Sequence, residues 1–594
     1  MKFKKSFISM LAIAAVVVAC EKPAPTPEDP TQDPTENPGG EPEEEEPTIT
    51  EDGTEAHPWL VKSLEDLQAV REKATPGAET FFRLEADIDM TSVKNWIPVN
   101  CGDTETVGEG EAATTATTFT RKINFDGNNK TISNFAPTTW YLEDGLTEAG
   151  YQSLFGVLYG TVKNLNVTGA NLVDVKASAG ILAGYAGTMQ NEVVMAAVVS
   201  NVSVQGTITA VGDKVGGMAG AAYYATFENC NADVTITTST TDCGGLIGKA
   251  VGELTVTGCN VKANITSNAA TKNRVGGLIG WNSTAKTTIT DAHVLEGSVL
   301  TDGSNRTSAS NGNFGGLIGF GDTTGTEMTI SKSSANCVIV GSTFGTYNGG
   351  FVGGFGYASV VTITDSWSAG EAVGHNYTGG FVGAVQNTLT LKRCWSSANV
   401  STTAGKHVGG LVGTNTTNDI VIEDCYTTGN VDGYEQLVGG IIGRSAKGLT
   451  MKNCFATGRV QGEISGVAGL VGKIEAASTV ENCIAWNSEI ECTRASNAVW
   501  APGAVTGTVA KASTLKNCYR RSDLVLKDVS MTLVDHENIE NDLPPLPAYT
   551  DSDNNQRAYH GKAAAAGKTL SVVAKELGWD ETIWDLSKDV PALK

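Results

Sequence analysis

Cysteine thiols are the first groups in this chain that could do chemistry, since a thiolate attacks electrophiles, binds metals and forms disulfides. The sequence has no C-x-x-C pair, which a metal site within one structural unit would need. Seven of the twelve cysteines share one position, ten to twelve residues after a recurring glycine: Cys230, Cys259, Cys394, Cys425, Cys454, Cys483 and Cys518. We assign no metal site and no cofactor.

In a stacked repeat, equal positions form one column of side chains. Stacked strands hold their Cβ atoms about 4.8 Å apart, whereas a disulfide needs about 3.8 Å. We therefore expect a buried ladder of small apolar thiols at the seven positions. Four further cysteines lie off this column, and their pairing stays open: Cys101, Cys243, Cys337 and Cys492.

In the C-terminal half, the residue at the next position is mostly aromatic. The series reads Trp367, Trp395, Tyr426, Phe455, Ile484 and Tyr519. If the cysteine column points inward, these neighbours point outward and form a stripe on one face. Such a stripe could stack sugar rings, or the rings could stack on one another and stabilise successive coils. The candidate ligand-binding residues are Trp367, Trp395, Tyr426 and Phe455.

Familiar catalytic motifs are missing from the sequence. His536–Glu540 resembles the start of a zinc-protease motif but lacks its second histidine, and no G-x-S-x-G or G-H-G string occurs. His375 and His407 are expected at solvated corners, and Asp87 with Asp89 on one solvated strand face. We assign no catalytic residue.

A carbohydrate-active enzyme, either a polysaccharide lyase or a glycoside hydrolase, remains the alternative function, because its residues could be scattered over successive coils. A lyase usually needs acids for calcium beside a basic residue. The longer loops at residues 264–274 and 300–313 favour binding, because their only charged residues are Lys272, Arg274, Asp302 and Arg306.

The elements that would position these residues come from a repeat. The phrase G-G-x-x-G or a degenerate copy of it ends at glycines 184, 220, 248, 280, 319, 353, 383, 413, 443, 472 and 507, at intervals of 28 to 39 residues. Self-similarity at such a period indicates a solenoid or a propeller.

Each unit contains three short apolar stretches bounded by Gly, Asn or Asp, and none has helical periodicity. Three short strands per turn of about 30 residues suit an all-β, right-handed parallel β-helix. The paired glycines would allow either close backbone approach or positive φ at a corner. A propeller ranks second, because one blade needs four antiparallel strands and about 40 residues or more.

The repeated phrase, complete in copies such as Gly244–Gly248 and Gly409–Gly413, resembles the GLUG motif of bacterial surface and secreted proteins. The resemblance covers residues 180–507, and the stretches Phe82–Met90 and Phe125–Ile132 resemble the lead-in usual in such proteins. It implies a β-helix but little about activity, because the motif accompanies adhesin-like proteins and peptidase domains alike.

The N-terminus reads as an export signal. Lys2, Lys4 and Lys5 precede the apolar run 7–18, which is too short to span a bilayer. The run ends in Val-Val-Ala-Cys and resembles the bacterial lipobox, which implies lipidation of Cys20 and a membrane partner through that anchor.

Residues 21–56 carry thirteen acids, one lysine and eight prolines, so they are expected to form an extended, disordered tether. The acidic stretch also resembles the signal that sends Bacteroidetes lipoproteins to the outer face of the outer membrane. Cell-surface display is therefore the expected location, with the periplasmic leaflet as the alternative. A net charge of -23 argues against nucleic acid as a partner, and leaves a glycan or a host surface protein.

Both ends of the repeat array are expected to carry short helical caps, since open strand edges would pair with other chains. Ser63–Asp66 is a capping-box pattern with Leu64, Leu67 and Val70 on one side of a helix. Residues 543–547 read as a stiff linker, residues 569–577 as a helix, and Trp579 with Trp584 as the cover of the last coil. The domains are 1–20 (signal), 21–56 (tether), 57–150 (N-terminal cap and first coils), 151–518 (repeats) and 519–594 (C-terminal linker and cap).

Overall fold

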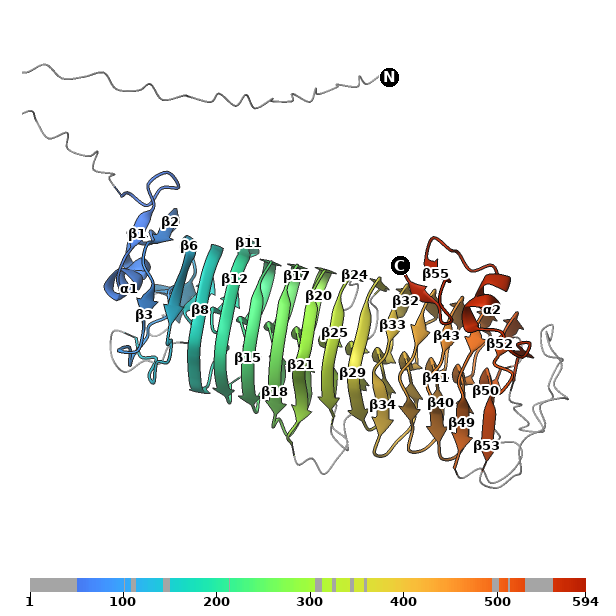
Figure 1. Cartoon of the computed structure of the whole chain (residues 1–594). Helices are drawn as coiled ribbons and strands as arrows, with labels where there is room; N and C mark the ends of the chain where they lie inside the picture. Colours follow the sequence, from blue (N-terminus) through green and yellow to red (C-terminus); the bar gives the residue numbers. More distant parts are fainter. Residues whose placement is uncertain are drawn as a thin grey trace, which may run out of the picture. The chain divides into compact units, whose positions relative to one another are not determined.

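The computed structural model describes residues 51–594 except 101, 108–113, 143–149, 213, 305–311, 323–326, 342–346, 357–359, 494–501, 511–512 and 529–558. It is a parallel β-solenoid of about 11 turns with two short helices (Figure 1). One sheet of 41 strands and one of nine run along the coils. Successive coils pair in parallel throughout, which confirms the parallel β-helix and excludes the propeller.

One coil is illustrated by residues 408–432, which form five short strands: β35 (Val408–Gly409), β36 (Val412–Asn415), β37 (Ile420–Glu423), β38 (Tyr426–Thr427) and β39 (Val431–Asp432). Each strand pairs with its counterpart in the next coil. In upstream coils the same path is covered by three longer strands, such as β14 (Ala219–Glu228), β15 (Asn231–Thr238) and β16 (Asp242–Gly244). Three strands per turn therefore describe the upstream coils, and corners subdivide them downstream.

The motif glycines serve close backbone approach rather than positive φ. A Cβ on Gly409 would lie 2.0 Å from the Val412 carbonyl oxygen, and one on Gly410 would lie 2.1 Å from that of Gly440. None of the motif glycines of this coil has φ in the left-handed region. Between β35 and β36 the chain folds back sharply, so that the outer sides of the two strands touch at these glycines. The residues before and after this bend form two rows that face each other.

Other residues supply the left-handed corners. Asp424, Asn453, Asn482 and Asn517 have φ between 51° and 53°, each directly before a cysteine of the column. The Asn453 amide donates to Asp424 Oδ1 at 3.1 Å, and the Asn517 amide donates to Asn482 Oδ1 at 2.9 Å. Asn and Asp tolerate this conformation better than other side chains do, and here they also link neighbouring coils. The sequence pattern predicted the cysteine column but not this ladder.

The expected thiol column is confirmed. Cys230, Cys259, Cys394, Cys425, Cys454 and Cys483 are buried, reduced thiols, and Cys518 continues the column. Each thiol lies near the carbonyl two residues earlier; the Cys454 Sγ, for example, is 3.0 Å from the Lys452 oxygen. Cys243, Cys337 and Cys492 are buried as well, and Cys101 lies outside the described residues.

These thiols should be almost unreactive in the folded protein. All seven thiols of the column are buried, so a reagent cannot reach their sulfur atoms in the folded protein, and burial holds the pKa of Cys394 and of Cys454 well above the usual thiol range. We expect peptide mapping after thiol alkylation to show little labelling of the column in native protein and complete labelling in denaturant. Disulfide-linked peptides, such as Cys425 with Cys454, would contradict the ladder.

The N-terminal end is built largely as expected. Helix α1 (Leu64–Lys73) begins at Ser63 with both hydrogen bonds of the capping box, and Leu67 and Val70 are fully buried. The expected strand over residues 82–90 is instead two strands, β2 (Glu79–Leu84) and β3 (Ile88–Asp89). The alternation of buried side chains holds except at Ala86, which lies between the two strands and is partly exposed.

The C-terminal end differs from the expectation. Strand β54 (Lys562–Ala563) pairs in parallel with β52 (Tyr519–Arg520) and so covers the edge of the last coil. Helix α2 (Leu570–Glu576) and the following tryptophans then run back along the side of the solenoid (Figure 1). The prediction that Trp579 and Trp584 cover the last coil is therefore wrong. The linker expected at residues 543–547 lies outside the described residues.

Among the described residues, no helix is long and apolar enough to cross a membrane.

Candidate functional site

The predicted aromatic stripe exists as a ladder along one column. Trp367 in β29 (Trp367–Gly374), Trp395 in β33 (Trp395–Ser396), Tyr426 in β38 and Phe455 in β43 (Phe455–Ala456) are register partners in successive coils. Their ring centroids are 4.9, 5.7 and 4.8 Å apart, and the planes differ by at most 6°. The rings thus stack on one another, which was the structural alternative for this stripe.

The C-terminal segment covers the downstream part of the ladder. The Trp584 indole donates to Asp424 Oδ1 at 3.2 Å, and the Trp579 indole donates to the Asn482 carbonyl at 3.1 Å. Phe455 is fully buried beneath these two rings. Phe455 therefore cannot contact a ligand in this arrangement, contrary to the expectation that it lies on the surface. Burial also raises the pKa of Tyr426 to about 12.

Trp367 and Trp395 remain partly exposed, and we name them the tryptophan platform. Because the two rings face each other, their edges are turned outward rather than their faces. The upstream face of Trp367 is turned toward its register partner Ser334, whose side chain is too short to cover an indole. A sugar ring could stack on that face, at the upstream end of the ladder.

Upstream of the platform, the same column carries hydrogen-bonding side chains. Asn231, Asn260, His293 and Ser334 follow one another in register and lead to Trp367. The Asn260 amide lies 3.4 Å from Asn231 Oδ1. Amide and hydroxyl groups beside an aromatic ring are the usual elements of a sugar site. The sequence predicted this column only in its aromatic half.

His293 joins two neighbours in a hydrogen-bonded chain. Its Nε2 is 3.0 Å from Asp291 Oδ1, and its Nδ1 is 2.8 Å from Ser334 Oγ. Acid, imidazole and hydroxyl in this order resemble the relay of serine hydrolases. However, Ser334 is only 4 % exposed, and its backbone N–H already donates to the Ala292 carbonyl within the sheet. A substrate therefore has no open access to the Ser334 hydroxyl. We interpret the three hydrogen-bonded residues as a structural ladder.

A second row of aromatic residues lies at the glycine corner, and we name it the corner row. Its upstream members Tyr151, Tyr185 and Tyr223 have centroids 5.2 and 5.4 Å apart. Its downstream members are Phe320, Tyr347, Tyr377 and His407, with neighbouring centroids 5.0 to 6.1 Å apart. The sequence signal was present, because these residues flank the motif glycines, but only the bend brings the two flanks face to face.

His407 is buried in this row rather than solvated, so the prediction for this residue is wrong. It is 5 % exposed, and its Nδ1 has no hydrogen-bond partner among the described residues. Burial lowers its pKa to about 3, with a further contribution from the nearby Arg444 and Lys406. His375 is partly exposed, and burial lowers its pKa as well.

The buried imidazole predicts a specific loss of stability in acid. Below about pH 6.5 the unfolded chain binds a proton at His407, whereas the folded chain does not until about pH 3. This site therefore costs up to about 1.4 kcal/mol of stability per pH unit within that window. His407→Asn, which keeps a residue suited to φ 69°, should lose less stability than wild type from pH 6.5 to 4.5. Urea unfolding at several pH values tests this, and parallel pH profiles would contradict it.

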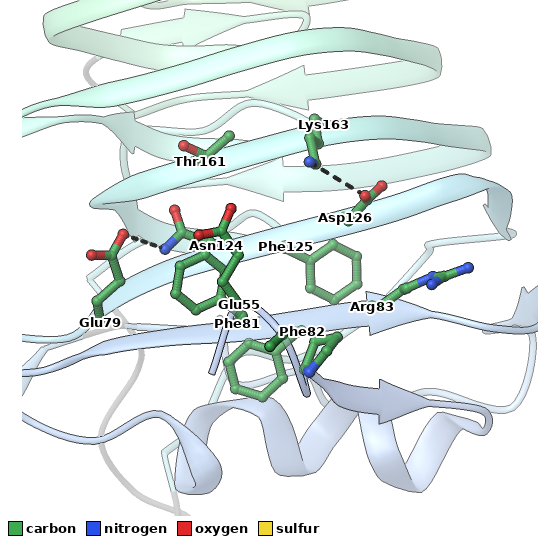
Figure 2. A pocket seen from close by; sticks show the side chains of 12 residues that line it. Glu55, Glu79, Phe81, Phe82, Arg83, Asn124, Phe125, Asp126, Thr161 and Lys163 are labelled. Atoms are coloured by element: carbon green, nitrogen blue, oxygen red, sulfur yellow. Dashed lines mark hydrogen bonds and ion pairs between the residues drawn. The ribbon is translucent and has the colours of Figure 1, made fainter. Parts of the chain in front are cut away.

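A shallow hollow of about 460 Å³ lies on the first coils (Figure 2). Phe81, Arg83, Asn124, Asp126 and Lys163 are among its lining residues. Most of its polar groups are engaged with one another; for example, the Asn124 amide donates to Glu79 Oε1 at 2.8 Å, and Lys163 lies 3.5 Å from Asp126. None of the candidate catalytic or ligand-binding residues named from the sequence lines this hollow.

Asp87 and Asp89 have structural partners. Asp87 Oδ1 accepts from the Thr131 N–H at 2.7 Å, and Asp89 Oδ1 accepts from Thr91 and from the Asn134 amide. The pKa of Asp89 is lowered, and the hydrogen bond from the Thr91 side chain is the largest cause. Within the described part of the chain, no cluster of three or more His, Cys, Asp or Glu could hold a metal ion.

Comparisons with known proteins bear on the repeat that builds the solenoid. The family model "The GLUG motif" matches residues 404–432, which include Gly409–Gly413. A stretch of 185 residues is 29% identical to halomucin of Haloquadratum walsbyi; it covers 29% of this chain and 2% of halomucin.

A solved structure from Bacteroides ovatus, provisionally named an immunoglobulin A1 protease, aligns with 91% of this chain and 94% of its own at 16% identity. The TM-score of this superposition is 0.24, which is too low to support an inference about the chain. The motif match and the solenoid together make this a GLUG-repeat β-helix protein.

Proposed function

We propose that this GLUG-repeat solenoid is a lipid-anchored scaffold of the bacterial outer membrane, displayed on the cell surface, that binds a glycan or a host surface protein without catalysing a reaction. One observation carries the proposal: a single column leads from the side chains of Asn231, Asn260 and His293, past the enclosed Ser334, to the tryptophan platform. An aromatic face in line with amide and imidazole side chains favours sugar recognition. The absence of catalysis is inferred from the enclosed Ser334 and the lack of enzyme motifs.

A glycan array tests binding. Full chain made as Cys20→Ser, and therefore without lipid, should bind a subset of glycans, and Trp367→Ala with Trp395→Ala should abolish that binding. The same double variant should lower the melting temperature by only a few degrees, since each stacking contact contributes about 1 kcal/mol. Trp367→Phe with Trp395→Phe keeps the ladder and is the matched control. Unchanged binding by the alanine variant would remove the platform from the function.

A screen of polysaccharide substrates on the same protein tests the lack of catalysis. We expect no release of reducing ends or of unsaturated products. Release of either that disappears in His293→Ala would instead favour the carbohydrate-active enzyme.

Lipidation at Cys20 has its own test, because residue 20 lies outside the described residues. Cys20→Ala removes the thiol that would be acylated, so the variant should lose the lipid mass and normal signal cleavage. Mass spectrometry of the membrane fraction measures both. An alanine variant that is processed normally and carries the same acyl mass would show that this is not a lipobox.

Surface display can be measured separately with intact cells. External protease should cleave the wild-type chain on whole cells if the anchor faces outward. Protection from protease until the outer membrane is opened would place the chain on the periplasmic leaflet.

A further inference from the structure

The outer face of the first coils forms the floor of the hollow in Figure 2. Strands β2, β6 (Lys122–Ser133) and β8 (Gly160–Val175) pair in parallel in that order, and alternate side chains point outward here. Six outward side chains form two rows of register partners across the three strands: Phe81, Asn124 and Thr161 in one row, and Arg83, Asp126 and Lys163 in the other. Neighbours in a row lie about 4.8 Å apart, which places these groups within reach of one small ligand.

A hydrogen-bonded turn forms one wall of the hollow. Glu55 and its neighbours line the hollow from the segment before β1 (Trp59–Val61), a strand that pairs with β2. The Gly53 N–H donates to the His57 carbonyl at 3.0 Å, which closes the turn, and the Phe81 N–H donates to the Gly53 carbonyl at 2.9 Å. The wall is therefore fixed to the floor without a ligand, and a fixed site avoids the entropy cost of ordering a loop on binding.

Asp126 is held in one orientation and keeps its second carboxylate oxygen for a further donor. Its Oδ1 accepts from the Asn128 N–H at 2.9 Å and from the Asn164 amide at 3.1 Å. Its Oδ2 lies 3.5 Å from Lys163 Nζ, which is longer than a normal hydrogen bond (Figure 2). A ligand hydroxyl between these two groups could donate to Oδ2 and accept from the ammonium at the same time.

Other groups that line the hollow also have capacity for a ligand. Arg83 is exposed, and its Nε lies 3.0 Å from Glu85 Oε1, while a guanidinium has five N–H donors in all. The side chains of Glu55 and Thr161 make no hydrogen bond or ion pair within the described part of the chain. Phe81 is partly exposed, so its ring can pack against an apolar face of a ligand.

The charges around the hollow nearly cancel. The lining carries two cations and three carboxylates: Arg83, Lys163, Glu55, Glu79 and Asp126. One of these carboxylates, that of Glu79, is also paired with Lys122 at 2.9 Å. A charged ligand therefore gains little net attraction here, whereas a neutral ligand with several hydroxyls forms charge-assisted hydrogen bonds with groups of both signs. The volume of about 460 Å³ lies within the range of about 300 to 1,000 Å³ typical of small-ligand sites.

An extended peptide is the main alternative ligand, and the sheet disfavours it. Peptides that bind β-sheets usually add a strand at a free edge. At the hollow, β2 lies between β1 and β6, and β6 lies between β2 and β8. The hollow therefore offers the face of a sheet and no free edge among these strands.

We propose that the hollow, which we name the first-coil site, binds a neutral sugar. The Phe81 ring packs against the apolar face of the sugar, and Asp126 and Lys163 form hydrogen bonds with its hydroxyl groups. This site goes beyond the proposed function, because it uses other coils and other side chains than the tryptophan platform and does not depend on them.

Saturation-transfer NMR, which detects weak ligands, tests the first-coil site. The full chain made as Cys20→Ser with Trp367→Ala and Trp395→Ala lacks the platform, so a signal from it does not come from the platform. The probes are glucose, galactose, mannose, fucose and N-acetylglucosamine, with glucuronate, glucosamine and triglycine for comparison. We expect a signal from at least one neutral sugar. Adding Phe81→Thr with Arg83→Gln should raise the Kd of that sugar roughly tenfold or more, and adding Thr161→Val, which keeps the shape of the side chain, should raise it severalfold.

A matched control separates the site from general effects of the substitutions. Tyr434→Thr with Lys447→Gln also removes one ring and one positive charge, at exposed positions of downstream coils, and should leave the Kd unchanged. An equal rise in Kd in this control, an unchanged Kd in the Phe81→Thr/Arg83→Gln variant, or a signal only from the charged probes or triglycine would each overturn the inference.

The same measurement distinguishes the first-coil site from the proposed function. Sugar binding that is present with the platform intact and absent from the platform variant would support the proposed function and overturn the first-coil site. Sugar binding that survives loss of the platform and is lost in the Phe81→Thr/Arg83→Gln variant would support the first-coil site whether or not the platform binds a glycan.

Discussion

Gly410→Val should destabilise the solenoid by about 3 kcal/mol or more, one of the two largest single-site effects we expect in this chain. A Cβ at this position would lie 2.1 Å from the Gly440 carbonyl oxygen and 3.2 Å from the Thr427 side chain. Gly440 belongs to the next coil, and its oxygen is backbone, so it cannot rotate away. Relief requires separating two stacked coils, which breaks pairing on both sides of the bend. Chemical denaturation followed by circular dichroism measures the loss.

The matched control is Gly150→Val. Among the described residues, no atom lies within 4 Å of a Cβ added to Gly150, and the φ of Gly150 is not in the left-handed region. The same change in side chain should therefore alter stability by only a few tenths of a kcal/mol. If the two valine variants unfold at the same denaturant concentration, the motif glycines are not required for close approach.

Trp584→Ala should release the C-terminal segment from the side of the solenoid. Trp584 is fully buried against Phe455 and donates its indole N–H to Asp424. Loss of a buried tryptophan ring costs about 3–5 kcal/mol, a large fraction of what holds so short a segment in place. We expect limited proteolysis to remove residues following 559 much faster than in wild type, while the far-ultraviolet circular dichroism of the coils persists.

Trp584→Phe keeps one aromatic ring in the site but removes the hydrogen bond to Asp424 and part of the buried indole, so it should lose less stability than the alanine variant and stay docked. Release in the alanine variant should also expose Tyr426 and Phe455, which a hydrophobic dye would detect. Proteolysis at the wild-type rate in Trp584→Ala would show that the docking does not depend on this side chain.

Much of this architecture follows from the sequence because the chain repeats. Glycines at near-constant intervals predict that residues one period apart become neighbours in adjacent coils, and the thiol column and the ladder from Trp367 to Phe455 follow from that rule. The capping box at Ser63 is equally local, since its hydrogen bonds span three residues. In these cases the periodic spacing or the local pattern is itself the structural information.

The sequence did not indicate which of these residues would stay accessible. Phe455 and Trp584 are 129 positions apart, and no repeat relates them, so the cover over the ladder depends on how a non-repeating segment packs. The burial of His407 in the corner row depends on the angle of the glycine bend, which close backbone contacts determine. Register determined the columns, whereas packing across the bend and at the C-terminal end decided which of them could meet a ligand.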